Sequence, residues 1–290
     1  MVDLSNSCKA EENMNIKIYM CCHKSYDSVP PLCVPIQGGR AINPPIENID
    51  GDNVGDNISE KNREYCELTV QYYAWKNEEH DAYGFCHYRR FFCFGKNTKK
   101  PYLVFGKMTD GNKKAYFGTE EDALRIISEN DIVVTRSEDL GTSVRSYYEN
   151  AVHHYKEDLS LFLEVLSEKY PGFMPYANSY LSGNRQYLCN MFVMKKVIFD
   201  EYCSMLFSVL EEFDKRKTMH GDFQSDRTDG YLGERFLGMF ISYAVSKGLR
   251  IYEVPRIDVG CTLKKRIIYK LFPPESKLRF FIKKLVKGVI

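Results

Sequence analysis

The sequence predicts an α/β protein in which a central sheet carries helices on both faces. Short apolar segments typical of buried strands alternate with longer segments whose apolar residues recur every three or four positions. The chain has 290 residues, of which 44% are hydrophobic, so it can build a substantial core. We expect a flexible extension at 1–14, one large domain at 15–260 and a basic amphipathic tail at 261–290.

The strands and helices follow one another along the chain in a regular order. Strands are predicted at 16–22, 82–88, 131–135, 187–196 and 249–255. Helices are predicted at 57–77, 119–130, 143–169, 198–216 and 231–248. Segment 30–57 is rich in Pro, Gly, Asn and Asp and is therefore predicted as a loop, and loops of this length are usually functional.

The predicted helix at 57–77 points its N-terminus toward that loop. Its apolar residues, spaced by three and four, lie on one face and are Tyr65, Leu68, Tyr72 and Trp75. Asn57 and Glu60 fit a capping pair, and Ser59 is an alternative cap. Because unpaired N–H groups at a helix start carry partial positive charge, this end is suited to an anion.

The stretch YGFCHYRRFF places charged side chains inside a run of aromatic residues. In a continuous strand His87 and Arg89 share one face, whereas Tyr88 and Arg90 share the other. The two arginines can therefore serve one ligand only if the chain bends near Tyr88. Arginine forks suit phosphate oxygens, so a diphosphate is one possible partner, and carboxylates of neighbouring loops are the other.

Further polar residues stand at predicted strand ends and on predicted helices. They are His23, Lys24, His153, His154, Asn190, Glu234 and Arg235. A single histidine on a helix is more often a satisfied structural group than a catalyst. Asn190 lies in an apolar strand and needs a partner when buried. Glu234 could act as a base facing a cleft or could stabilise a helix N-terminus.

The common nucleotide and hydrolase signatures are absent from the sequence, including GxxxxGK[ST], GxGxxG, HExxH and GxSxG. The ten cysteines are scattered through apolar segments, so we expect reduced core thiols. Cys21, Cys22 and His23 are adjacent, and Cys86, His87 and Cys93 lie close together in sequence. No CxxC pair is present. No metal site is therefore predicted from these residues.

Basic residues are concentrated in the tail. Between 264 and 290 there are nine Lys and Arg and one acid, Glu275, which leaves the main body with more acidic than basic residues. An acidic body is a poor nucleic-acid binder. The aromatic and basic residues of the strand could also indicate an RNA-binding module, but the acidic body makes this the weaker hypothesis. No leader and no apolar run of 18 residues is found, which favours a cytoplasmic protein.

Segment 273–290 predicts an interfacial helix. Its apolar face comprises Leu278, Phe281, Ile282 and Leu285, with lysines around the edges. Such a helix could rest on anionic lipid, where each basic residue contributes about 1 kcal/mol. The alternative is a terminal helix that docks on the domain and keeps its lysines in solvent.

Four separated motifs resemble the bacterial family called domain of unknown function 4422. They are GDNISEKNREYCELTVQYYAWKN, GFCHYRRFF, YLCNMFVMKKVIFDEYCSMLF and DGYLGERF, and the resemblance spans 16–255. Members of this family look like glycosyltransferases of capsule, exopolysaccharide and O-antigen assembly, and some are assigned galactofuranosyl transfer. The resemblance implies a GT-A-like fold, whose Rossmann-type sheet binds a nucleotide-sugar at its strand ends.

Most GT-A enzymes hold the donor diphosphate through a metal bound to an Asp-x-Asp after a central strand. The resemblance places His87, Tyr88, Arg89 and Arg90 at that position in this chain. Mn²⁺ or Mg²⁺ remains possible, but no Asp-x-Asp stands where it is expected, since Asp50 and Asp52 lie in the early loop. Direct neutralisation of the diphosphate by the arginines becomes the favoured reading.

The family motifs also imply roles for individual residues. Those implied to bind substrate are Asp56, Asn57, Ser59, Asn62, His154 (with Asp158), Asn190 and Arg235, besides His23, Lys24 and the HYRR residues. An inverting enzyme of this class needs a carboxylate near the acceptor hydroxyl. Glu234 is the first candidate for that base and Asp229 the second.

The resemblance thus implies a hexosyltransferase that moves a sugar, galactofuranose or galactose among the options, from a UDP-sugar to a lipid-linked or oligosaccharide acceptor. It would act peripherally on the inner face of the cytoplasmic membrane, which the tail would contact. A non-catalytic assembly protein of the polysaccharide machinery is the alternative.

Overall fold

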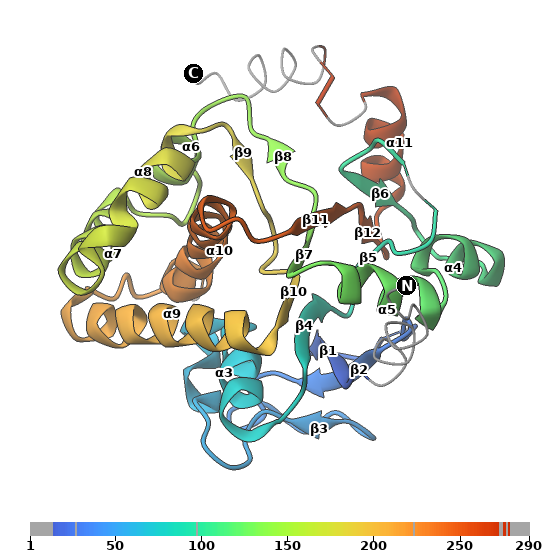
Figure 1. The fold of residues 1–290 in the computed structure, drawn as a ribbon, viewed down its shortest axis with the longest axis horizontal. Coiled ribbons are helices and arrows are strands. Elements are labelled where there is room, and N and C mark those ends of the chain that lie inside the picture. Colours follow the sequence, from blue (N-terminus) through green and yellow to red (C-terminus); the bar gives the residue numbers. More distant parts are fainter. Residues whose placement is uncertain are drawn as a thin grey trace, which may run out of the picture.

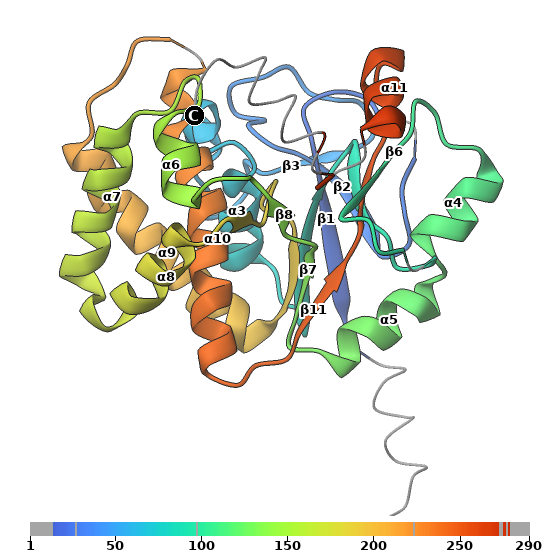
Figure 2. The same cartoon turned by 90° about the horizontal axis from the view of Figure 1, so that it is seen from above.

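A computed structural model describes residues 14–26, 28–96, 98–222, 224–272, 275, 276 and 278. It has three layers, with a central sheet between two groups of helices (Figures 1 and 2). The predicted α/β class with helices on both faces of the sheet is confirmed.

Seven strands form the main path of the sheet, in the order β11-β7-β10-β4-β1-β2-β3. Their bounds are β1 Ile16–Cys22, β2 Cys33–Gln37, β3 Asp50–Gly51, β4 Ala82–His87, β7 Ile132–Thr135, β10 Phe192–Lys195 and β11 Ile251–Val254. All neighbouring pairs are parallel except those of β10, which runs antiparallel to both β4 and β7. The first residues of β10 therefore meet the last residues of β4.

Three short strands extend the sheet beyond β4. They are β5 Arg90–Phe92, β6 Tyr102–Val104 and β12 Arg256–Asp258, and β12 pairs with both of the others. A separate small ribbon joins β8 Glu138–Asp139 to β9 Arg185–Gln186. The sequence did not predict these strands, because each has two or three residues and is defined by its distant partner rather than by a local pattern.

The larger helical layer comprises α3 Leu68–Asn77, α6 Val144–Glu149, α7 Lys156–Lys169, α8 Met174–Ser182, α9 Lys196–Arg216 and α10 Thr228–Ser246. The opposite face is covered by α4 Asp110–Phe117 and α5 Glu120–Glu129 (Figure 2). Alternation along β1 divides the core between the layers, since Tyr19 packs with the first group and Ile18 and Met20 with the second.

The predicted helix at 57–77 is interrupted. A 3₁₀ turn, η1 Ser59–Lys61, leads into the four-residue helix α2 Asn62–Tyr65, and the chain then turns at Cys66, whose φ is 53°, before α3 begins. The expected capping pair does not form, because Ile58 is the N-cap residue and makes no side-chain cap. Apolar spacing alone could not reveal a left-handed residue inside this stretch.

The predicted helix at 143–169 is likewise two helices. Its chain leaves α6 after Glu149 and re-enters helix α7 at Lys156, with a φ of 66° at His153 in between. His153 and His154 therefore stand in a loop rather than on a helix. The remaining predicted strands and helices are found, with ends that differ by a few residues.

Two further helical turns, η2 Pro171–Phe173 and η3 Ser225–Arg227, precede α8 and α10, and α11 Leu263–Leu271 follows the last strand. The interfacial helix predicted at 273–290 lies almost wholly outside the described residues. Within the described part, no helix is both long and apolar enough to cross a bilayer. The nine cysteines in that part are not joined by disulfides.

Candidate active site

The candidate site lies where β1 and β4 end beside the start of β10. Parallel β1 and β4 finish at the same edge of the sheet, and antiparallel β10 begins there. Strand β4 ends at His87, Tyr88 and Arg89 form a two-residue turn, and Arg90 pairs with His87 across the resulting hairpin. The bend required near Tyr88 is therefore present, and residues directly opposite in an antiparallel pair share a face, so Arg90 accompanies His87.

Both arginines of the hairpin are exposed. The guanidinium of Arg89 lies over the ring of Tyr88, 4.9 Å from its centroid. Within the described part of the chain, neither Arg89 nor Arg90 makes an ion pair or a side-chain hydrogen bond with a carboxylate. The alternative of internal ion pairs with neighbouring loops thus finds no partner there.

His87 is held by the backbone of the segment that precedes β10. Its Nε2 lies 2.9 Å from the carbonyl oxygen of Cys189 and 3.9 Å from Oε1 of Glu67. Because a carbonyl only accepts, Nε2 carries the hydrogen and Nδ1 keeps its lone pair when the ring is neutral. Burial lowers the pKa of His87, which favours that neutral ring near pH 7.

Asn190 is buried, and its side-chain nitrogen finds two acceptors while its Oδ1 has no hydrogen-bond partner among the described residues. Its Nδ2 donates to Oε1 of Glu67 at 2.8 Å and to the carbonyl of Gly230 at 3.3 Å. Cys189 and Asn190 both have left-handed backbones, with φ of 75° and 47°. Two consecutive non-glycine residues in this region are costly and are held only where their surroundings fix them, as at functional sites.

Glu234 joins the same group from α10. Its Oε1 accepts a hydrogen bond from the backbone N–H of Cys189 at 2.9 Å, and its Oε2 accepts one from Arg235 at 3.1 Å. The residue lies in the second turn of the helix rather than at its opening, and its side chain remains partly exposed. The peptide groups of Cys189 therefore connect Glu234 with His87.

His23 and Lys24 directly follow the end of β1, the strand next to β4, and both residues are exposed. Nε2 of His23 lies 3.2 Å from the hydroxyl of Tyr88. Burial of the ring, followed by the positive charges of Lys24 and Arg89, lowers the pKa of His23. The ring is therefore neutral at pH 7 and adds no positive charge to those of Lys24 and Arg89.

Two residues of the site were not predicted from sequence. Glu67 lies between His87 and Asn190, as described above. Arg227, at the end of η3, donates from Nε to Sγ of Cys66 at 3.1 Å, and its guanidinium is 5.8 Å from the ring of Tyr231. Burial raises the pKa of the Cys66 thiol to about 12, so the thiol is neutral and does not balance the arginine.

We refer to these residues as the strand-end cluster: His23, Glu67, His87, Arg89, Arg90, Asn190, Arg227 and Glu234. The cluster places three guanidinium groups and two carboxylates at one edge of the sheet, drawn from β4, β5, η3 and α10 and from the segments that follow β1 and β4 and precede α3 and β10. Such a group can bind an anion through arginine and can remove a proton through glutamate.

The GDNIS residues organise the neighbouring loop. Ser59 Oγ and Thr69 Oγ1 each donate to Asp52 at 2.5 Å, and the carboxylate also accepts from the backbone N–H groups of Gly39 and Arg40. Asp52 is fully buried, so its oxygens are saturated by these four donors and do not form a metal site with Asp50.

Asp56, Asn57 and Asn62 also make local contacts. Asp56 accepts from the hydroxyl of Tyr72, Asn57 donates to the Gly55 carbonyl, and Asn62 donates to the carbonyl of Cys66. The loop reaches the site through its backbone, because Gly38 N donates to the carbonyl of Cys22 at the end of β1. The structure thus places these residues beside the strand-end cluster rather than within it.

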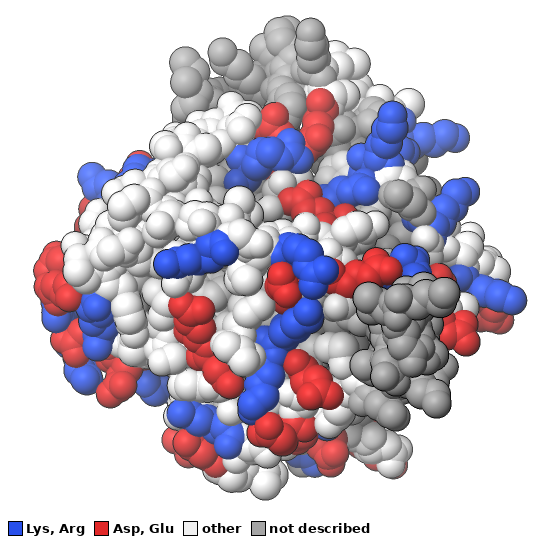
Figure 3. Space-filling model, viewed as in Figure 1, with Lys and Arg blue, Asp and Glu red and all other residues white. Residues whose placement is uncertain are grey.

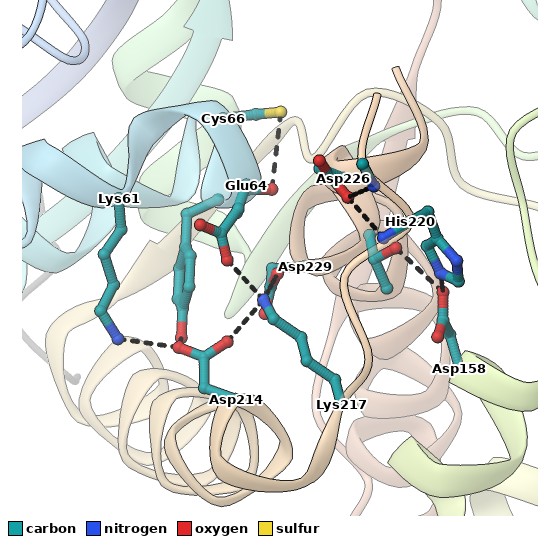
Figure 4. Close-up of polar contacts among 12 residues, drawn as sticks. Lys61, Glu64, Cys66, Asp158, Asp214, Lys217, His220, Asp226 and Asp229 are labelled. Carbon is teal, nitrogen blue, oxygen red and sulfur yellow. Dashed lines mark hydrogen bonds and ion pairs between the residues drawn. The ribbon is translucent and has the colours of Figure 1, made fainter. Parts of the chain in front are cut away.

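Asp229 lies beneath the site in a buried ionic group (Figure 4). Lys217 Nζ is 2.6 Å from Oδ2 of Asp229, 2.6 Å from Oε2 of Glu64 and 2.7 Å from Oδ1 of Asp214. Burial raises the pKa of Asp229 to about 7, against the opposing effect of Lys217. The carboxyl faces an ammonium group that fixes the loop before α10.

His154 and Arg235 pack behind Glu234. The His154 ring stacks on Tyr231 with a centroid distance of 4.1 Å, and burial, followed by the charge of Arg235, lowers its pKa to about 4. The partner of Asp158 is not His154 but His220, whose Nε2 lies 2.8 Å from Oδ2 (Figure 4). These contacts fix the outer end of the loop that carries Arg227.

The donor set at the strand-end cluster does not match a divalent cation. Over the described residues, the His, Cys, Asp and Glu side chains that converge closely enough to hold a metal are Glu64, Asp214 and Asp229, and Lys217 already lies among them. At the cluster itself the HYRR segment supplies guanidinium groups, which cannot be metal ligands. We therefore derive no chemical step that requires a metal.

The comparisons agree with this architecture. The chain is similar to a solved structure described as the apo structure of WbbM, a bifunctional glycosyltransferase, with a TM-score of 0.80 and 29% identity. The match covers 84% of this chain and 45% of the other, so this chain spans about half the length of that protein. A search of curated proteins found no match. The family model of domain of unknown function 4422 matches residues 17–245, and the chain belongs to that family.

Proposed function

We propose that this protein is a glycosyltransferase that uses a nucleotide-sugar, with its donor site at the strand-end cluster. The observation that carries the proposal is the pair of exposed arginines on the β4–β5 hairpin, which have no carboxylate partner in the described chain. Similarity to WbbM, a bifunctional glycosyltransferase, supports the same class of reaction.

In this proposal Arg89 and Arg90 bind the diphosphate of a UDP-sugar. Forked, charge-assisted hydrogen bonds suit phosphate oxygens and contribute about 1.5–3 kcal/mol each. When the bond between the anomeric carbon and the diphosphate oxygen breaks, the leaving UDP gains negative charge, and the guanidinium groups stabilise it. No metal is needed for this electrostatic role.

Glu234 is the proposed general base. As the acceptor hydroxyl attacks the anomeric carbon, its proton passes to the carboxylate and the new glycosidic bond forms. Hydrogen bonds from Cys189 N and Arg235 hold both carboxylate oxygens, which fixes their direction at the cluster. The buried ionic contacts of Asp229 favour Glu234 over it for this role.

The finer assignments are also proposals. The sugar would be galactofuranose or galactose, and the acceptor a lipid-linked or oligosaccharide glycan in capsule, exopolysaccharide or O-antigen synthesis at the inner face of the cytoplasmic membrane. A thermal-shift panel of nucleotide-sugars, with and without Mn²⁺, tests the donor and the metal together. We expect a UDP-sugar to stabilise the protein without requiring Mn²⁺.

Calorimetric titration of UDP into the wild-type protein, Arg89→Ala and Arg90→Ala tests the donor site. We expect each substitution to weaken binding by about tenfold to a hundredfold, from the loss of one or two charge-assisted hydrogen bonds. Arg125→Ala, on α5 at the opposite face of the sheet, is the matched control and should bind as the wild type does. Unchanged affinity in both site variants would exclude the diphosphate role.

A further inference from the structure

Helix α11 presents its apolar side to solvent. It spans Leu263–Leu271, begins at the N-cap Thr262 and stands at the periphery beside β6 (Figures 1 and 2). The side chains of Leu263, Ile267, Ile268 and Leu271 are 66%, 48%, 41% and 63% exposed. At 100° per residue these four fall within one arc of about 140° of the helix surface, which also contains Lys264.

The opposite side of α11 holds the helix to the domain through polar groups. The hydroxyl of Tyr269 donates to the carbonyl of Tyr102 at 2.6 Å, and the two rings lie 5.5 Å apart. Lys265 Nζ lies 3.1 Å from Oδ2 of the buried Asp258 on β12. These contacts fix the rotation of the helix about its own axis. Its polar side faces the domain, whereas a typical surface helix turns its apolar side inward.

Basic residues lie within and beside this outward apolar arc, except that Lys265 is held on the inner side by Asp258. The helix carries Lys264, Lys265, Arg266 and Lys270 and has no acidic residue. Figure 3 shows Lys and Arg gathered over this corner of the molecule. In sequence the chain continues beyond Leu278 with further basic residues at 279, 283, 284 and 287.

We propose that the outward face of α11 docks on a bilayer containing anionic lipids. Apolar side chains would enter the boundary between headgroups and acyl chains, and the lysines would contact the lipid phosphates. Charge argues against the other occupants. A second copy would bring two basic helices together, and the chain's own C-terminal segment is basic as well.

The position of α11 connects this surface with the strand-end cluster. Asp258, which binds Lys265, is registered opposite Arg90 in the β5–β12 pair. Gly260, just before the helix, lies against the side chain of Arg89. A bilayer that α11 contacts would therefore lie at the same edge of the molecule as the cluster, within reach of a lipid-linked substrate.

Vesicle flotation with the full chain tests this proposal without depending on enzymatic activity. The vesicles are phosphatidylcholine alone and phosphatidylcholine mixed with phosphatidylglycerol. We expect the wild type to float with the anionic vesicles only. Lys264→Glu/Lys270→Glu should weaken partitioning by at least tenfold, since each basic residue contributes about fivefold, equivalent to about 1 kcal/mol.

The apolar contribution is tested by Leu263→Ser/Leu271→Ser, which should also lose flotation. Matched controls on other helices are Val197→Ser/Val245→Ser for exposed apolar residues and Lys169→Glu/Lys247→Glu for charge, and both should float normally. Circular dichroism checks that all variants are folded.

Three results would overturn the proposal. They are the absence of wild-type flotation, equal binding to neutral vesicles, and unchanged binding of both α11 variants. Light scattering tests whether a second copy of the chain occupies this face. A wild-type dimer that becomes monomeric in Leu263→Ser/Leu271→Ser would assign the face to a second copy instead.

Discussion

At the scale of single residues, the strand-end cluster combines cations that make no ion pair with a carboxylate of the described residues with carboxylates that are held by hydrogen bonds. Arg89, Arg90 and Arg227 supply the first group, while Glu67 and Glu234 form the second. Arg227 is half-buried beside a neutral thiol, so it has given up water without forming an ion pair with any carboxylate in the described part of the chain. A bound anion would correct that imbalance.

Arg227 should therefore contribute to donor binding although no sequence motif singled it out. We expect Arg227→Gln to weaken UDP binding by about tenfold or more, because one charge-assisted contact is lost. Arg63→Gln in nearby α2 is a suitable control, and titration calorimetry compares them. If the wild type binds UDP and Arg227→Gln binds it equally well, the residue is structural while the donor site stands.

Glu234 makes a separable prediction about turnover. Glu234→Gln keeps the size of the side chain and one acceptor oxygen, but its NH2 group cannot accept the second hydrogen bond and the amide cannot act as a base. Transfer of sugar to an acceptor should fall by about 10²–10⁴, while UDP affinity changes little. Full activity of this variant would exclude Glu234 as the base, and the same assay on Asp229→Asn would then decide the second candidate.

At the scale of elements, the loop between α9 and α10 is fixed at two points. Lys217 holds its start to α2 and α10 through three carboxylates, and His220 holds its middle to α7 through Asp158 (Figure 4). Arg227 and the first turn of α10 follow directly. The buried ionic group therefore influences the site through position and not through contact with substrate.

This ionic group predicts a pH dependence of stability. Three carboxylates share one ammonium group, and burial favours a proton on Asp229, whose pKa rises from 3.8 to about 7. A carboxyl whose pKa is higher in the folded state binds more protons there than when unfolded. Its contribution to the free energy of unfolding therefore falls as pH rises from about 4 to 7, by about 1.4 kcal/mol for each unit separating the two pKa values.

Asp229→Asn removes that titration. We expect the melting temperature of the wild type to decrease more than that of the variant between pH 5 and pH 8, as followed by circular dichroism. Asp110→Asn, an exposed residue of α4, should retain the wild-type slope. Identical slopes in the wild type and Asp229→Asn would show that Asp229 titrates in its ordinary range.

The elements also show what sequence reasoning can and cannot reach. Strands with strong apolar runs, such as β1, β4 and β7, and the long helices α9 and α10 were predicted because their patterns are local. The breaks at Cys66 and His153 were missed, since a left-handed residue leaves the apolar spacing unchanged. Breaking the first helix turned the expected anion-binding helix start into a short 3₁₀ turn.

The same distinction holds for the candidate site. The HYRR residues, Asn190 and Glu234 were predicted because charged and amide groups stand out in apolar surroundings or match family motifs. Glu67 and Arg227 stand in ordinary polar sequence, and each makes a hydrogen bond in the site with a residue more than a hundred positions away, Asn190 and Cys66 respectively. Their chemistry is visible in the sequence, whereas their location is a property of the fold.

At the scale of the whole molecule, one reversed strand assembles the site. Because β10 runs against its neighbours, the Cys189 and Asn190 backbone enters at the edge where β1 and β4 end. Helix α10 then brings Glu234 to the same point. The docking surface proposed on α11 lies along that edge as well, so donor, acceptor and bilayer could meet on one side of the domain.

The two-residue turn between β4 and β5 makes the arginine pair sensitive to chain length. Side chains alternate across a strand with a period of two, so one extra residue between His87 and Arg90 would move the Arg90 guanidinium to the opposite face. The sequence would still contain both arginines, but their side chains would no longer point to the same binding site. Among naturally occurring variants, single-residue insertions or deletions at this turn should therefore be tolerated less well than substitutions of Tyr88 by another aromatic residue.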